Sequence, residues 1–294
     1  MEIRTMTSFN ENKVEFVLNT LIGSMEQGTI PWILPYNDVA SVARSFTTKK
    51  PYSISNQMYL FVQQLNNEGE YIGQKAVEND KNLSLKEGAR PLKIFFALPP
   101  MYRETKTPTG EKQQQWYGGF TKVHIVYNVK DVNGINNEFE SSSNFEYLNA
   151  DDVIKKYIGK TGIKISIENV TPAYNQSDDT ISIPNKEQFV NETEYYKTIF
   201  HEIIHSTITK ERCNRKGIFL KRDEQDEYAA EELVAEIGAA YLAALCNLPD
   251  YINTIPNAAA YCQGWYNKLK GTPSLLLKAS NAAEKAVRYI LEHD

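Results

Sequence analysis

The stretch FHEIIHST, residues 200–207, places two of the four histidines of the chain four positions apart, with a glutamate directly after the first. On an α-helix, residues i and i+4 lie on the same face, so His201 and His205 can bind one metal ion. Glu202 lies beside them, where a carboxylate can take a proton from an attacking water and pass it to a leaving amine. This HExxH pattern predicts a Zn²⁺ site with Glu202 as the catalytic base. The alternative is two unrelated histidines that share a helix.

The residues around the motif predict a buried helix. Thr193 followed by Glu194 is typical of an N-cap with an acidic first turn. Phe200, Ile203 and Ile204 then place apolar side chains on the remaining faces, and a helix that is apolar nearly all round is buried. A histidine pair inside such a helix needs a partner, which a metal ion supplies.

The third metal ligand is expected from a second helix, because catalytic zinc normally takes three protein ligands. That helix is predicted in DEYAAEELVAEIGAAYLAAL, residues 226–245. Glu232 and Glu236 lie four apart on a face otherwise made of alanine, where a charge needs a reason. We expect Glu232 to be the third ligand and Glu236 to accept a hydrogen bond from the free N–H of a liganding histidine. Glu231 competes for the ligand role, and a solvated acidic face is the alternative for all three.

Composition limits the classes of protein to consider. The chain has 294 residues, enough for two modest domains or one large one, and a net charge of −5. Three cysteines without CxxC spacing fit a reducing cytosol rather than a disulfide framework. No stretch approaches the ~18 apolar residues of a membrane span, so we expect a cytoplasmic protein without membrane contact. Residues 1–140 carry equal numbers of basic and acidic side chains, so a DNA-binding surface would have to be a local patch.

The first part of the chain is predicted to be α+β. Helical spacing runs from Val14 to Met25, and a second helix is expected within residues 53–69. Two β-rich runs follow, PLKIFFALP at 91–99 and TKVHIVYNV at 121–129, and their pairing predicts a long-armed hairpin. A linker rich in serine and charge is expected within residues 137–152.

The second part is predicted to contain a small sheet and then mostly helices. Its strands are expected in IKISIENV at 163–170 and DTISIP at 179–184, ahead of the HExxH helix. An edge strand beside a metal site can hold a peptide in extended form. We expect TISI, residues 180–183, to be that edge, and a plain hairpin strand is the alternative.

With both parts laid out, the chain resembles the ArdC family of antirestriction proteins over most of its length. The N-terminal resemblance runs through MEQGTIPWILPYN, KPYSISNQMYLF, GQKA, LKEGARPLKIFF and VHIVYNVKDVNG. The C-terminal resemblance runs through AYNQSDDTISIPNKEQF, YYKTIFHEIIHST, EELVAEIGAAYL and AAAYCQGWYNKLK. The resemblance implies an α+β fold of two domains: a single-stranded-DNA-binding domain at 1–140 and a zincin-like metallopeptidase domain at 146–294.

The resemblance also implies site residues and a biological role. By position, His201, His205 and Glu232 match the metal ligands and Glu202 matches the general base. The family usually has Trp-Thr-Gly after the second histidine, where this chain has Ser-Thr-Ile at 206–208. That difference leaves the pocket wall and the substrate open. The implied role is protection of incoming mobile-element DNA, as in conjugation, against host restriction.

The expected DNA contacts combine aromatic rings with basic side chains, because single-strand binders stack bases and bind phosphates. The aromatic candidates include Tyr36, Trp116 and Tyr117. The candidates that we favour are Trp32, Tyr52, Asn56, Lys75, Lys86 and Arg90.

Two other functions remain open. One is an intracellular zinc metallopeptidase whose N-terminal domain selects protein substrates without binding DNA. The other is a non-enzymatic fold that zinc only stabilises. In the peptidase readings, Tyr174 or Tyr196 is a candidate for stabilising the oxyanion.

Overall fold

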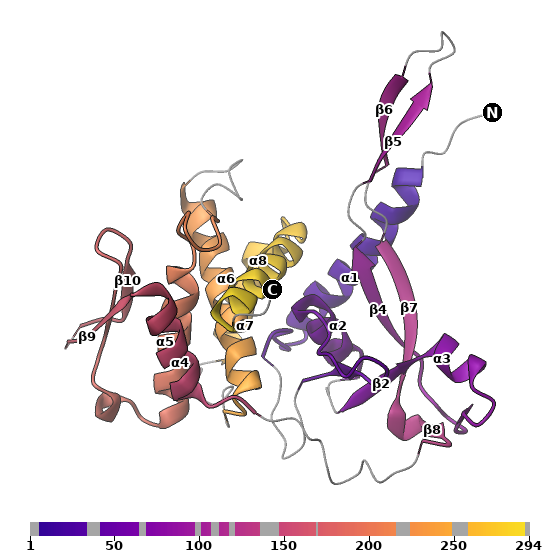
Figure 1. The fold of residues 1–294 in the computed structure, drawn as a ribbon, viewed down its shortest axis with the longest axis horizontal. Coiled ribbons are helices and arrows are strands. Elements are labelled where there is room, and N and C mark those ends of the chain that lie inside the picture. The colour runs from indigo at the N-terminus through magenta and orange to yellow at the C-terminus, as the bar shows by residue number, and fades with distance from the viewer. Residues whose placement is uncertain are drawn as a thin grey trace.

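A computed structural model describes residues 6–33, 42–64, 69–97, 101–106, 112–117, 121–135, 147–168, 170–215, 224–248 and 258–291. An α+β N-terminal half is followed by a mostly helical C-terminal half with a small sheet (Figure 1). The predicted fold class is therefore confirmed. The linker expected within residues 137–152 lies largely outside the described residues. Within the described part of the chain, no helix is both long and apolar enough to cross a membrane.

The N-terminal half is built on a four-stranded sheet in the order β1-β2-β7-β4. These strands span Arg44–Ser45 (β1), Glu70–Gly73 (β2), Thr121–Asn128 (β7) and Leu92–Ala97 (β4). Strands β4 and β7 pair antiparallel from Leu92↔Val126 to Ala97↔Thr121, which confirms the predicted hairpin. Its arms continue into a second antiparallel pair, β5 (Met101–Lys106) and β6 (Lys112–Tyr117), which projects from the sheet (Figure 1).

Helices and short elements complete this half. The helices are α1 (Met6–Glu26), α2 (Ile54–Gln64), α3 (Gln74–Asn79) and the 3₁₀ turn η1 (Val129–Asp131). A two-stranded ladder joins β3 (Ser84–Leu85) to β8 (Val132–Asn133). Helices α1 and α2 pack against the β4–β7 pair. Leu60 of α2 shares a buried cluster with Leu92 and Ile94 of β4 and with Val126 of β7.

The C-terminal half begins with α4 (Ala150–Thr161) and a three-stranded sheet in the order β10-β11-β9. The strands span Lys164–Ile167 (β9), Ala173–Asn175 (β10) and Thr180–Ile183 (β11). The prediction that TISI is an edge strand is wrong, because β11 pairs antiparallel with β10 and parallel with β9. Ile181 and Ile183 of β11 are buried, as suits a central strand. The edge that lies against the HExxH helix is β10.

The HExxH helix, α5, spans Glu192–Ser206 and follows the 3₁₀ turn η3 (Lys186–Gln188). Its N-cap is Asn191 rather than Thr193, because the Asn191 side chain accepts a hydrogen bond from the backbone N–H of Glu194 at 2.8 Å. Helix α6 (Glu224–Leu245) packs closely against α5. A Cβ at Gly238 of α6 would lie 2.6 Å from Cδ1 of Ile204, so glycine permits this close crossing.

One hydrophobic core joins the two halves. Helices α7 (Ala258–Leu269) and α8 (Ser274–Leu291) follow α6, and α8 packs against both α6 and α2 (Figure 1). Val17 and Leu21 of α1 belong to the same buried cluster as Trp265 of α7. The carboxylate of Glu284 in α8 also accepts a hydrogen bond from the backbone N–H of Ile54, at the start of α2, at 3.1 Å. The N-terminal helices therefore depend on the C-terminal half for part of their burial.

Candidate metal centre

Three predicted ligands converge between α5 and α6. The Nε2 atoms of His201 and His205, one turn apart on α5, lie 3.0 Å from each other. Glu232 of α6 places Oε2 3.5 Å from His201 Nε2 and Oε1 3.4 Å from His205 Nε2. All three side chains are partly buried, and among the described residues they form a cluster suited to a metal ion.

The separations match those of a divalent ion with tetrahedral ligands. Zinc lies about 2.0–2.2 Å from imidazole nitrogen and carboxylate oxygen, which places two tetrahedral ligand atoms about 3.3 Å apart. The observed separations of 3.0, 3.4 and 3.5 Å lie around that value. Two imidazoles and one carboxylate leave a fourth position for water, which is the arrangement of catalytic rather than structural zinc sites.

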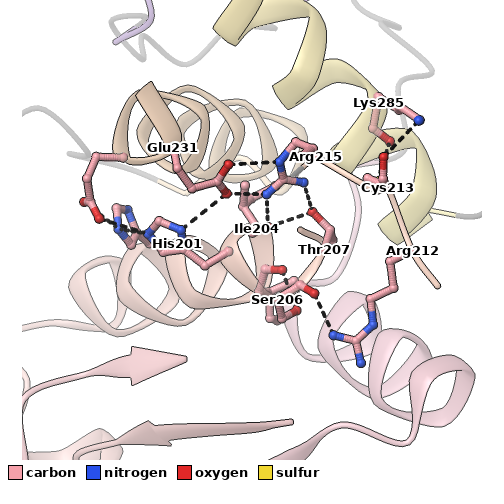
Figure 2. Close-up of polar contacts among 12 residues, drawn as sticks. His201, Ile204, Ser206, Thr207, Arg212, Cys213, Arg215, Glu231 and Lys285 are labelled. Atoms are coloured by element: carbon pink, nitrogen blue, oxygen red, sulfur yellow. Dashed lines mark hydrogen bonds and ion pairs between the residues drawn. The ribbon is translucent and has the colours of Figure 1, made fainter. Parts of the chain in front are cut away.

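Glu231 lies on the other side of His205 from Glu232. Its Oε1 is 3.5 Å from Nδ1 of His205, the nitrogen that does not face the other ligands. The guanidinium of Arg215 holds the same carboxylate, with Nε donating to Oε2 at 3.1 Å and Nη2 donating to Oε1 (Figure 2). Glu231 therefore orients the His205 ring, an outer contact typical of metal sites. This geometry favours Glu232 over Glu231 as the third ligand.

The charges around His205 shift two pKa values in opposite directions. Burial disfavours the charged imidazole, but Glu231 and Glu232 outweigh it and raise the pKa of His205 to about 9. Burial likewise acts against the Glu231 carboxylate, yet His205 and Arg215 lower its pKa. A metal ion must displace the proton that His205 holds in the metal-free protein.

Arg215 is a part of the site that the sequence did not indicate. Its side chain is 0% exposed, and it also donates to Thr207 Oγ1 and, at 2.9 Å, to the backbone carbonyl of Ile204 (Figure 2). Those two acceptors lie at the C-terminal end of α5, so Arg215 ties the end of this helix to α6 through Glu231. No spacing rule connects a residue in the turn after α5 to a glutamate sixteen positions later.

Glu236 of α6 lies near Nδ1 of His201, the nitrogen that does not face the other ligands. Its Oε1 is 3.9 Å from His201 Nδ1, which is longer than a hydrogen bond, so the predicted bond is not formed in this structure. Its other oxygen accepts a hydrogen bond from the hydroxyl of Tyr261 at 2.9 Å. A role for Glu236 in orienting His201 therefore stays a prediction, with Tyr261 as the group that positions it.

Tyr228 lies close enough to Glu202 and Glu232 for both carboxylates to affect its pKa. Glu202 is buried on α5, directly after the first ligand. Tyr228 begins the turn of α6 that precedes Glu232, and its side chain is 69% exposed. A hydrogen bond with Glu232, the charge of Glu232, burial and the charge of Glu202 together raise the pKa of Tyr228. Tyr228 was not among the residues expected from the sequence, although its i, i+4 spacing from Glu232 would have indicated it.

The two tyrosines expected to stabilise an oxyanion have other partners. The hydroxyl of Tyr174 donates to Asp179 Oδ1 at 2.8 Å. The hydroxyl of Tyr196 accepts from the ammonium of Lys186 at 3.3 Å, and its ring is buried. Neither phenol is described in contact with the three ligands, so an oxyanion role for them stays untested.

Two of the expected DNA contacts are structural instead. The ring of Trp32 is 3% exposed and packs edge-to-face against Trp265 at 6.1 Å between centroids. Asn56 is 1% exposed, and its amide donates to the carbonyl of Phe95 at 2.8 Å and accepts from the N–H of Phe95 at 2.9 Å. Neither side chain can contact DNA in this conformation, so the prediction is not carried forward for them.

Asn56 acts together with Gln63 to close the edge of the sheet. Gln63 lies two turns later on α2 and makes the same pair of bonds with the backbone of Lys93, both at 2.8 Å. The two amides thus replace a neighbouring strand along the outer edge of β4, which would otherwise present unpaired backbone groups. Alternate N–H and C=O groups of an edge strand point outward, which is why residues 93 and 95 are the ones bonded.

The other DNA candidates stay predictions. Tyr52 is half-buried, its hydroxyl lies 3.4 Å from the carbonyl of Tyr71, and burial raises its pKa to about 12. Lys75, Lys86 and Arg90 are exposed, and Arg90 donates to the Gln63 carbonyl at 2.6 Å. Tyr36 lies outside the described residues, as do the side chains of Trp116 and Tyr117.

Comparison with known proteins finds a matching family model for each half of the chain. Residues 11–127 match the family model for the N-terminal domain of the anti-restriction factor ArdC, and residues 152–282 match that of a zincin-like metallopeptidase. The crystal structure of the metal-free antirestriction protein ArdC from plasmid R388 is 25% identical, with a TM-score of 0.70 over 95% of this chain and 96% of that one. Its Mn(II)-bound structure is 23% identical, with a TM-score of 0.66 over 95% and 97%.

The chain also resembles part of a larger protein. DNA primase TraC from Escherichia coli is 25% identical over 293 residues, which cover 94% of this chain but 27% of the primase. A second Escherichia coli protein with the same name is 30% identical over 118 residues, 40% of this chain and 8% of that protein. The chain thus spans about a quarter or less of the length of these relatives.

Proposed function

Because the chain belongs to the ArdC-type family, which joins an ArdC N-terminal domain to a zincin-like metallopeptidase domain, we propose that it is an antirestriction protein that binds single-stranded DNA. It binds without strong sequence preference and protects mobile-element DNA from host restriction in the cytoplasm. The observation that carries the proposal is the likeness to ArdC over 95% of the chain, across both halves in the same order.

The C-terminal half carries a divalent-metal peptidase site, with zinc as the preferred ion. Its donors are His201, His205 and Glu232, a set that suits zinc well. A bound ion would supply a Lewis acid that activates water and polarises a peptide carbonyl. Glu202 accepts the proton of the attacking water and delivers it to the leaving amine.

DNA binding is tested with the full chain, because its N-terminal helices share a core with the C-terminal half. Fluorescence anisotropy of a labelled single-stranded oligonucleotide is titrated against salt and compared with duplex DNA of the same sequence. Tight binding that prefers the single strand and weakens steeply with salt is expected. Absence of salt-sensitive binding would remove the DNA-binding function.

A second candidate is a metallopeptidase whose N-terminal half selects protein substrates. The equal numbers of acidic and basic residues in 1–140 favour it, because DNA binders are usually basic. Cleavage of casein that is lost in Glu202→Gln, in a protein that does not bind DNA, would establish this candidate. DNA binding without any cleavage would exclude it.

A further inference from the structure

A cavity of about 370 Å³ lies where the two halves meet. It is open to solvent and is bounded by the first turn of α2, the end of β4 and one face of α8, through residues that include Ser55, Phe95, Phe96, Asn281, Lys285 and Arg288. Its volume lies within the roughly 300–1,000 Å³ of sites that hold small organic ligands. The cavity is separate from the metal ligands, none of which lines it.

Ser55 forms part of the cavity wall at the start of α2. Its residue is 3% exposed, and its hydroxyl has no hydrogen-bond partner among the described residues. That oxygen is itself buried, so the hydroxyl lies behind the surface of the cavity, and Ser55 contributes to the shape of the wall rather than a polar contact to a ligand.

Phe96 gives the same cavity an exposed aromatic ring. It is 45% exposed near the end of β4, and the ring of His124 on β7 supports it edge-on, with centroids 5.3 Å apart. A ring that is held by a neighbour and left exposed at a cavity is suited to stacking on a flat ligand. Lys122, the residue paired with Phe96 across the sheet, is also exposed and adds a positive charge nearby.

Helix α8 adds a polar and positively charged wall. Asn281, Lys285 and Arg288 lie at i, i+4 and i+7, so they follow one face of the helix, and all three are exposed. The ammonium of Lys285 donates to the neutral carbonyl of Cys213 at 3.0 Å, which leaves its charge uncompensated by that contact.

The cavity also contains one acid, Glu284. One of its oxygens accepts the backbone N–H of Ile54 at 3.1 Å, and the other pairs with Arg288 at 2.7 Å. The carboxylate is thus engaged by the start of α2 and by one cation. The two cations of α8 against this single acid favour a ligand with a negative charge.

We propose that this cavity holds one nucleotide of bound single-stranded DNA, with its base on the ring of Phe96. The polar edge of the base forms a hydrogen bond with Asn281, and its phosphate lies beside Lys285 and Arg288. The inference rests on the proposed DNA-binding function and adds that α8, part of the metallopeptidase half, forms one wall of the DNA site. Bound DNA would then contact the half of the chain that carries the metal ligands.

The test measures binding of a fluorescein-labelled oligothymidylate to the full chain by anisotropy. Phe96→Leu keeps an apolar side chain but removes the stacking surface, so at least a fivefold loss of affinity is expected, about the smallest effect seen for base–aromatic stacking. Phe96→Trp retains a stacking ring and should bind like the wild type. Arg288→Gln should lower the slope of log affinity against log salt by about 0.7, the contribution of one single-strand phosphate contact.

Asn281→Ala separates binding from folding. Because Asn281 is exposed on α8, removing its amide should leave the thermal unfolding midpoint nearly unchanged, while affinity for the oligonucleotide falls. Lys278→Ala is the matched control, because Lys278 is an exposed cation of α8 that does not line the cavity. It should leave both affinity and salt slope unchanged.

The outcomes distinguish this inference from the function on which it rests. If the wild type binds but Phe96→Leu and Asn281→Ala bind equally well, the DNA lies elsewhere and the cavity assignment is overturned alone. If the wild type does not bind single-stranded DNA, the proposed function is overturned together with the cavity. A loss in Phe96→Leu that Phe96→Trp does not restore would also overturn stacking at this position.

Discussion

Replacing Arg215 with methionine is expected to weaken both the fold and metal binding. The side chain is fully buried and makes four hydrogen bonds, two to the Glu231 carboxylate and one each to Thr207 Oγ1 and the Ile204 carbonyl. Arg215→Met leaves a buried carboxylate without its counter-charge, which costs about 3–5 kcal/mol of unfolding free energy. Because Glu231 also orients His205, affinity for metal should fall by about 10- to 100-fold.

The assay combines chemical denaturation of the metal-free protein with zinc binding in competition with a chromophoric chelator. Arg212→Met is the matched control, because Arg212 is also nearly buried but contacts Asp179 at 2.6 Å and the Ser206 carbonyl at 2.7 Å rather than Glu231. It should lose stability and keep wild-type metal affinity.

The double variant Arg215→Met with Glu231→Gln tests the electrostatic reason. It contains no unpaired buried carboxylate and should therefore be more stable than Arg215→Met alone. A folded Arg215→Met protein with wild-type zinc affinity would refute the coupling to His205. Equal losses of zinc affinity in Arg212→Met and Arg215→Met would refute it as well.

Three further predictions concern the catalytic base Glu202, the protonation of His205 and the two amides that cover the edge of β4. Glu202→Gln should bind zinc like the wild type, while any peptide cleavage measured with a quenched fluorogenic peptide library falls by about 10²- to 10⁴-fold. His205, whose pKa is raised from 6.5 to about 9, stabilises the metal-free fold fully below about pH 6.5 and progressively less as the pH rises through 9. Over the same interval zinc affinity should rise, because the metal needs the neutral ring, and thermal unfolding with and without zinc from pH 6 to 9.5 measures both trends. If either the stability of the metal-free protein or its zinc affinity does not change over this pH range, His205 is not protonated in the metal-free protein. Asn56→Leu and Gln63→Leu should each lower the unfolding free energy by about 1–3 kcal/mol in urea titrations and leave oligonucleotide affinity unchanged, since each uncovers two backbone groups of β4. If Asn56→Leu instead weakens oligonucleotide affinity without lowering the unfolding free energy, Asn56 contacts DNA after all.

Because the two halves share one core, DNA binding should be measured on the full chain rather than on the N-terminal half alone. Residues of α1 pack in one cluster with α7, and Glu284 of α8 bonds to the first turn of α2. A fragment that ends near residue 140 would expose those surfaces and lose the bond at the start of α2. Binding experiments on such a fragment would mix effects of DNA contact with effects of folding.

Local patterns were sufficient for much of the site. The i, i+4 spacing of His201 and His205 fixes two imidazoles on one face of any helix that includes them. The alanine-rich face around Glu232 and Glu236 indicated that these acids meet another helix, and α6 does pack against α5 there. The choice between Glu231 and Glu232 was open in sequence, because adjacent residues on a helix point about 100° apart and only the crossing of α5 and α6 selects one.

What the sequence could not supply were contacts between residues without a fixed spacing. Trp32 and Asn56 have the residue types of DNA contacts, but long-range packing places one beside Trp265 and bonds the other to the edge of β4. Strand order had the same limit, since the alternation that predicts a strand at 180–183 does not say which strands pair on its two sides. The sequence by itself thus determined the elements, the ligand types and the family, because these depend on periodicity and spacing along the chain. The tertiary structure alone decided that Arg215 orients the site through Glu231 and that α8 completes a cavity with α2 and β4, because those arrangements depend on which distant surfaces are buried together.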